Sequence, residues 1–64
     1  MYFNFTVYIR HLDVPTWKVV AEDESNARNL INNLLIGDDY TLEDLRFQLE
    51  GESNESRSYA TSDF

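Results

Sequence analysis

The apolar residues of this chain change their spacing along the sequence, and that change constrains the fold more than any other feature. Between residues 3 and 10 apolar and polar residues alternate strictly, and the same two-residue period returns between residues 16 and 22. This period is typical of strands with one buried face. Residues 11–15 break the alternation and contain Pro15. We therefore expect the two strands to pair as an antiparallel hairpin.

A helical period follows the hairpin. Apolar residues fall on one stripe of an amphipathic helix at Ala27, Leu30, Ile31, Leu34 and Leu35. We expect the carboxylate of Asp23 to cap the first turn of this helix, because it can accept hydrogen bonds from the free amides there. Gly37 is expected to end the helix, because glycine readily adopts the left-handed conformation found at helix C-termini.

Residues 41–50 allow two interpretations. Leu45, Phe47 and Leu49 alternate with polar residues, which predicts a third strand over residues 44–50. The alternative is a helix, because residues 41–44 (TLED) resemble a capping box and Leu42, Leu45 and Leu49 have helical spacing. We favour the strand, since Phe47 would lie on the polar side of that helix.

The composition changes at residue 51. Residues 51–64 are rich in serine and acidic residues and have few apolar side chains. Such a segment buries too little surface to order itself, so we expect a flexible tail after a folded domain of residues 1–50.

The elements predict a small two-layer α+β domain of ββαβ order. One helix would cover one face of a three-stranded sheet with strand order 3-1-2, the first strand central. The expected core is Phe3, Phe5, Val7, Ile9, Trp17, Val19, Ala21, Ala27, Leu30, Ile31, Leu34, Leu35, Leu45, Phe47 and Leu49. The other face of the sheet, and the outer edges of the second and third strands, would be uncovered.

The charge balance disfavours several classes of partner. Twelve acidic residues stand against five basic ones, a net charge of −7, and residues 22–64 carry eleven of the acids. Nucleic acids and anionic membrane surfaces attract basic patches, so we expect neither as a direct partner. A basic protein surface fits this charge. The first residues lack a basic start and an apolar stretch, which favours a cytoplasmic location.

Catalytic and cofactor motifs are missing from the sequence. The chain has one histidine, two distant glycines and no cysteine, so thiolate metal sites and glycine-rich phosphate loops are excluded. Asp38, Asp39, Glu43 and Asp44 form an acidic cluster without the ligand spacing of a calcium loop. We expect no enzymatic activity, no cofactor and no resident metal.

The uncovered sheet face is the expected binding surface, because tyrosine and arginine are enriched at binding hot spots. The residues expected to contact a partner are Tyr2, Tyr8, Arg10, Lys18, Arg46 and Glu50.

Residues 17–27 (WKVVAEDESNA), followed by Leu30, Ile31 and a short strand, resemble a pattern found in small phage-encoded host-takeover proteins, such as the podophage inhibitors of bacterial RNA polymerase. The resemblance covers the pattern of residues 5–50. It implies a compact phage or mobile-element protein that inhibits a host machine by binding, through an acidic, arginine-bearing sheet surface. Arg10, Lys18, Arg46 and Glu50 fall at loosely comparable places.

The expected function is therefore a non-enzymatic modulator that occupies a basic, nucleic-acid-facing surface of a host protein such as RNA polymerase. The alternative is a self-assembling module, a homodimer for instance, that pairs through an open sheet edge. Binding of RNA through Tyr2 and Tyr8 is a third hypothesis, which the net charge disfavours.

Overall fold

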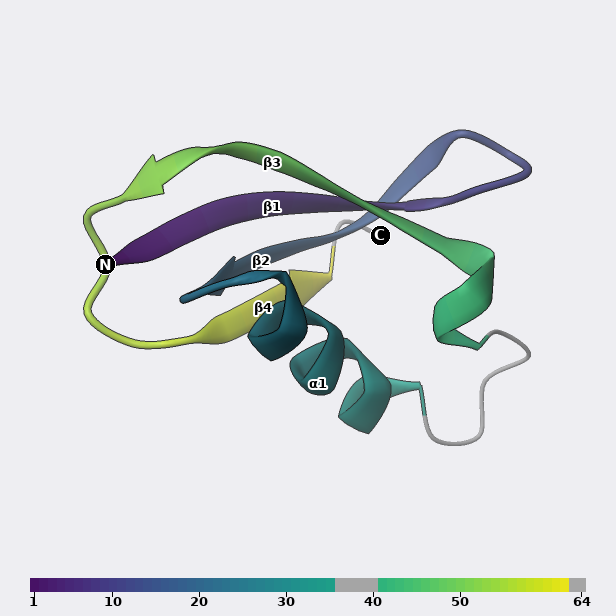
Figure 1. Cartoon of the computed structure of the whole chain (residues 1–64). Helices are drawn as coiled ribbons and strands as arrows, with labels where there is room; N and C mark the ends of the chain where they lie inside the picture. The colour runs from purple at the N-terminus through teal and green to yellow at the C-terminus, as the bar shows by residue number, and fades with distance from the viewer. Residues whose placement is uncertain (36–40, 63–64) are drawn as a thin grey trace.

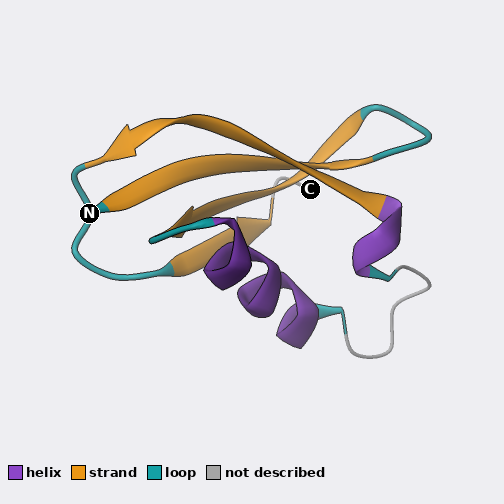
Figure 2. Ribbon diagram, viewed as in Figure 1, coloured by secondary structure: helices purple, strands orange, loops and turns teal. Residues whose placement is uncertain are grey.

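The computed structural model describes residues 1–35 and 41–62 of the chain. Its elements, in chain order, are the strands β1 (Tyr2–Ile9) and β2 (Val14–Ala21), the helix α1 (Glu24–Leu34), the 3-10 turn η1 (Leu42–Asp44), and the strands β3 (Leu45–Ser53) and β4 (Tyr59–Ser62). The strands form one twisted sheet and α1 lies against one of its faces (Figures 1 and 2). The α+β class predicted from the sequence is confirmed.

The sheet has four strands in the order β3-β1-β2-β4, with every neighbouring pair antiparallel. The expected order 3-1-2 is confirmed for the first three strands. The expected count of three strands is wrong, because β4 pairs with β2 and covers the edge that was expected to be open. A flexible tail over residues 51–64 is also wrong for residues 51–62, which form the end of β3, a loop and β4. Asp63 and Phe64 lie outside the described residues.

Non-local contacts hold β4 in place. Tyr59 pairs with Val20, and Ala60 pairs with Val19 and packs against the core. Just before the strand, the Ser58 hydroxyl donates a hydrogen bond of 2.7 Å to the side-chain oxygen of Asn26 in α1. This short segment is therefore ordered by its neighbours rather than by its own apolar content.

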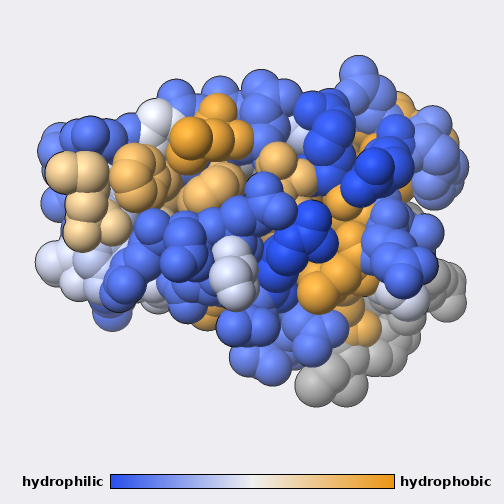
Figure 3. All heavy atoms as spheres, viewed as in Figure 1, coloured by the Kyte–Doolittle hydropathy of each residue, from blue (hydrophilic) through white to orange (hydrophobic). Residues whose placement is uncertain are grey.

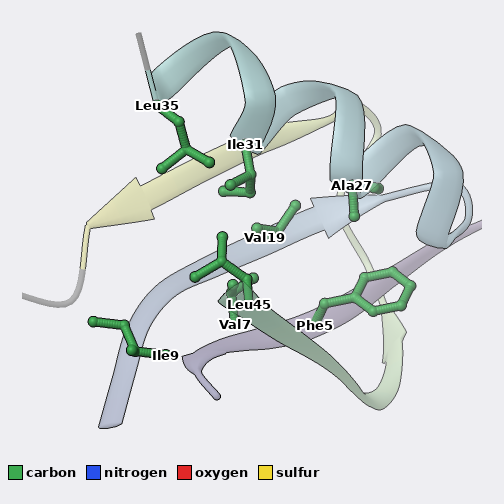
Figure 4. Packing of buried hydrophobic residues seen from close by; sticks show 9 residues of the cluster. Phe5, Val7, Ile9, Val19, Ala27, Ile31, Leu35 and Leu45 are labelled. Atoms are coloured by element: carbon green, nitrogen blue, oxygen red, sulfur yellow. The ribbon is translucent and has the colours of Figure 1, made fainter. Parts of the chain in front are cut away.

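The core lies between α1 and the sheet. Ala27, Ile31 and Leu35 point from the helical side toward the strands (Figure 4). The buried cluster is Phe5, Val7, Ile9, Val19, Ala21, Ala27, Ile31, Leu35 and Leu45, and Phe3, Trp17, Leu30 and Phe47 pack against it. All of these residues were expected in the core.

Two expected core residues are exposed instead. Leu34 is 45% exposed and Leu49 is 59% exposed. The reason for Leu49 is that α1 packs mainly on β2, β4 and η1, so it does not cover the part of β3 that carries this side chain. Figure 3 shows that hydrophobic residues reach the surface on this side of the molecule.

Local signals set the boundaries of α1 and β3. The Asn26 N–H donates a hydrogen bond of 2.8 Å to the Asp23 carboxylate, so the predicted N-cap is confirmed. The expected stop at Gly37 lies outside the described residues. Before β3, the Thr41 N–H donates to the Asp44 carboxylate at 3.0 Å, as in a capping box. The predicted third strand is confirmed, and the capping motif serves the single turn η1 that leads into it.

Candidate protein-binding face

The sheet face opposite α1, called the open face below, forms a shallow groove. The groove has a volume of about 720 Å³, and every strand contributes to its lining. The lining includes Asn4, Thr6 and Tyr8 from β1, Lys18 from β2, Glu50 from β3 and Tyr59 from β4. Apolar side chains such as Pro15 and Val20 share the lining with these polar groups, so the groove suits a partner surface of mixed polarity.

The floor of the groove is buried although no second layer covers it. Thr6 is 6% exposed and Val20 is 5% exposed. Thr6 lies opposite Lys18 and Gln48, and Val20 lies opposite Asn4 and Tyr59, so longer neighbouring side chains cover both residues. The open face is therefore a packed surface with a defined shape.

Carboxylates gather at one end of the open face, next to two tyrosines. Glu22 directly follows β2 and lies beside Tyr2, and Glu50 lines the groove. The Tyr59 hydroxyl donates a hydrogen bond of 3.2 Å to the Glu55 carboxylate. We call Glu22, Glu50 and Glu55, together with Tyr2 and Tyr59, the acidic end of the open face.

These surroundings raise the pKa values of the two tyrosine hydroxyls. Desolvation and the charge of Glu22 raise the pKa of Tyr2 above its ordinary value of 10.0. Desolvation and the charge and hydrogen bond of Glu55 raise the pKa of Tyr59 in the same direction, and Arg57 partly opposes the shift. Both side chains thus stay neutral hydrogen-bond donors near pH 7, beside carboxylates that can accept hydrogen bonds from a partner.

Arg46 organises the other end of the open face. Its guanidinium lies 4.1 Å from the centre of the Tyr8 ring, close enough for a cation–π contact. It also forms an ion pair of 2.7 Å with Asp13 and donates to the Gln48 side chain at 2.8 Å. Gln48 in turn donates to the Glu50 carboxylate at 3.1 Å. A row of hydrogen bonds therefore runs along β3 from one end of the face to the other.

The structure brings five of the six sequence-predicted residues together on the open face. These are Tyr2, Tyr8, Lys18, Arg46 and Glu50. Lys18 is exposed at the centre and forms no ion pair with any described residue. Arg10 follows the end of β1 and donates instead to the carbonyl oxygen of Leu45, at 3.2 Å.

Glu22, Glu55 and Tyr59 also belong to this face, although they were not predicted from the sequence. Glu55 and Tyr59 fall in the segment that was expected to be a flexible tail. The alternation of Tyr59 and Thr61 with Ala60 and Ser62 is a strand signal, but it spans only four residues.

The described residues contain no group of three or more His, Cys, Asp or Glu side chains that could hold a metal ion. His11 is exposed in the turn between β1 and β2.

None of the helices in the described part of the chain has the length and apolar content needed to cross a bilayer. The open face carries phenols, a lysine, an arginine and carboxylates.

The sequence matched no protein-family model, and comparisons with curated proteins and with solved structures gave no match either.

Proposed function

We propose that this protein is a non-enzymatic binding protein that occupies a basic, nucleic-acid-facing surface of a host protein, with bacterial RNA polymerase as the first target to test. It would act in the host cytoplasm as a phage or mobile-element inhibitor. The observation that carries the proposal is the acidic end of the open face, where carboxylates stand beside tyrosine side chains and where Glu50 and Tyr59 line the groove.

The charge of the whole chain supports the same partner class. A net charge of −7 steers a protein toward positive surfaces and repels it from nucleic acid. The acidic end supplies local charge, and its tyrosines supply contact area with few rotatable bonds. The complex would therefore compete with nucleic acid for the same basic surface of the partner.

Shape supports this function as well. The groove floor at Thr6 and Val20 is buried, and Arg46 is held by Tyr8 and Asp13. A face that is already ordered loses little side-chain freedom on binding, which favours affinity.

The test is a titration of purified bacterial RNA polymerase, core and holoenzyme, with the fluorescently labelled chain. We expect saturable binding that weakens steeply between about 50 and 300 mM salt, because exposed charges dominate the encounter. Glu22→Lys and Glu55→Lys should each weaken binding by about tenfold, because each reverses a charge at the acidic end.

The matched control is Glu43→Lys. Glu43 is also exposed and the charge change is the same, but it lies in η1 at the opposite end of the sheet. It should change the affinity by less than about threefold, since it lies outside the acidic end. If polymerase fails to bind at low salt, the target is wrong. If Glu43→Lys weakens binding as much as the other two changes, the acidic end is not the contact site.

A further inference from the structure

The outer edge of β3 is the basis of a second proposal, independent of the first. β3 lies at the end of the strand order, and no described strand pairs with its outer side. The Arg10 N–H donates to the Asp44 carbonyl at 2.8 Å, just beyond the end of β1. Hydrogen-bonded and non-hydrogen-bonded pairs alternate in an antiparallel ladder. The backbone groups of Arg46 and Gln48 therefore point toward β1, and those of residues 45, 47 and 49 point outward.

Two of these outward positions have no backbone partner within residues 1–35 and 41–62. At Leu45 both groups are used, because its N–H donates to the Leu42 carbonyl and its carbonyl accepts the Arg10 guanidinium at 3.2 Å. That leaves the N–H and C=O groups of Phe47 and Leu49 directed at the open edge. Leu49 is also 59% exposed, so the same position offers an apolar side chain without cover.

We propose that two copies of this chain pair antiparallel through β3, with the two-fold axis at Gln48. Phe47 then lies opposite the partner's Leu49, and the backbone groups that bond across the interface are those of Phe47 and Leu49. On the open face, Arg46 lies opposite the partner's Glu50. Each contact occurs twice, as a two-fold interface requires. The edge sequence Arg46-Phe47-Gln48-Leu49-Glu50 is thus complementary to itself.

Neighbouring registers are less favourable. An axis at Phe47 would place Glu50 opposite the partner's Asp44, which sets two carboxylates against each other. It would also require the backbone groups of Leu45, which already have partners. An axis at Leu49 would set the centre of the pairing next to the β-bulge at Glu50 and extend the ladder beyond it. With the axis at Gln48, the hydrogen-bonded pairs of Phe47 and Leu49 lie before the bulge, and Glu50 contributes only its side chain at the end of the ladder.

Edge pairing takes Glu50 from the acidic end but leaves Glu22, Glu55 and the groove floor accessible, because its backbone hydrogen bonds form on the outer side of β3. Either proposal can therefore fail without the other. Sedimentation, which gives the mass of the protein in solution, tests the dimer. Binding to RNA polymerase tests the proposed function.

The first experiment uses Gln48→Cys, since the natural chain has no cysteine. At the axis, Gln48 faces the partner's Gln48 as a non-hydrogen-bonded pair, with a Cα separation of about 4.5 Å. That separation lies within the range for a disulfide. We expect mild oxidation to yield mostly covalent dimer. Thr61→Cys is the control, because Thr61 is also exposed and lines the open face, but on β4 at the far edge. Equal cross-linking of both variants would contradict the proposed axis.

The second experiment exchanges the charges at the edge. Arg46→Glu and Glu50→Arg should each weaken the dimer by about tenfold, because each change creates two like-charged pairs across the interface. The double variant R46E/E50R should recover an affinity within about threefold of the natural chain. Circular dichroism verifies that each variant is folded. A natural chain that stays monomeric at about 200 μM, well above the concentration at which micromolar dimers form, would overturn the proposal. Single variants that dimerise normally would overturn the register.

Discussion

The two faces of the sheet bury their side chains by different means. On the helix side, Val7, Val19 and Leu45 lie under a second layer that α1 supplies. On the open face, Thr6 and Val20 are almost as buried, yet only neighbouring side chains of the same sheet cover them. One face excludes water by stacking two layers, and the other does so by lateral packing alone.

This difference suits the two faces of the sheet to different roles. The covered face removes apolar surface from water and so supplies most of the stability. The open face keeps its polar groups at a solvent-accessible groove, where they can contact a partner. Changes to the two faces should therefore separate loss of stability from loss of binding.

The largest effect is expected from Ile31→Ala on the covered side. Ile31 is fully buried, and its truncation leaves a cavity between α1 and the sheet. The expected loss is about 2–5 kcal/mol in the free energy of unfolding, comparable to the whole stability of a domain of this size. Leu34→Ala in the same helix is the control, because Leu34 is 45% exposed whereas Ile31 is fully buried. Urea unfolding followed by circular dichroism measures both, and equal losses would contradict the observed helix packing.

A smaller effect compares the two faces directly at adjacent valines. Val19 lies under α1 and Val20 forms the groove floor, so Val→Thr makes the same chemical change on each face. Val19→Thr should cost about 1–3 kcal/mol, because its hydroxyl is placed in an apolar core. Val20→Thr should cost less than about 1 kcal/mol, because its hydroxyl can reach the polar groove. Urea unfolding measures both losses in the free energy of unfolding. A larger loss for Val20→Thr than for Val19→Thr would mean that the groove floor excludes water better than the core under α1.

The covered face could be predicted from sequence, because its signals are local. Alternation marked β1 and β2, the helical stripe marked α1, and Asp23 marked the helix start. β4 could not be predicted in this way. Its four residues contain no apolar run, and they are ordered by pairing with β2 and by the Ser58–Asn26 hydrogen bond. Leu49 was misassigned because alternation gives the face of a strand but not the reach of the helix above it.

Residues of the open face could be predicted wherever the alternation of a strand alone decides on which face a side chain lies. Tyr8 and Arg46 share the face because they are opposite each other in the β1–β3 ladder. Arg10 follows the strand end, where register no longer decides its position, and its guanidinium bonds to the backbone of Leu45. The acidic end could not be predicted, because it depends on the conformation of the β3–β4 loop. This loop brings Glu55 to Tyr59, and no local sequence pattern indicates it.

The smallest effect concerns the phenols of the acidic end at high pH. The raised pKa values of Tyr2 and Tyr59 mean that the folded state holds these protons more tightly than the unfolded state does. Their contribution to stability is therefore fully present below pH 10 and is lost as the pH rises through the raised pKa values. We expect the free energy of unfolding to fall above pH 10.

The double variant Tyr2→Phe/Tyr59→Phe should flatten this alkaline decline, because neither side chain then carries an ionisable proton. Glu22→Gln/Glu55→Gln should flatten it in part, since it removes the carboxylate charges that raise both pKa values but leaves the desolvation in place. Thermal unfolding at a series of alkaline pH values measures the slopes. An unchanged slope in the first variant would mean that these phenols are not linked to folding. An unchanged slope in the second variant alone would assign the linkage to the desolvation of the two phenols.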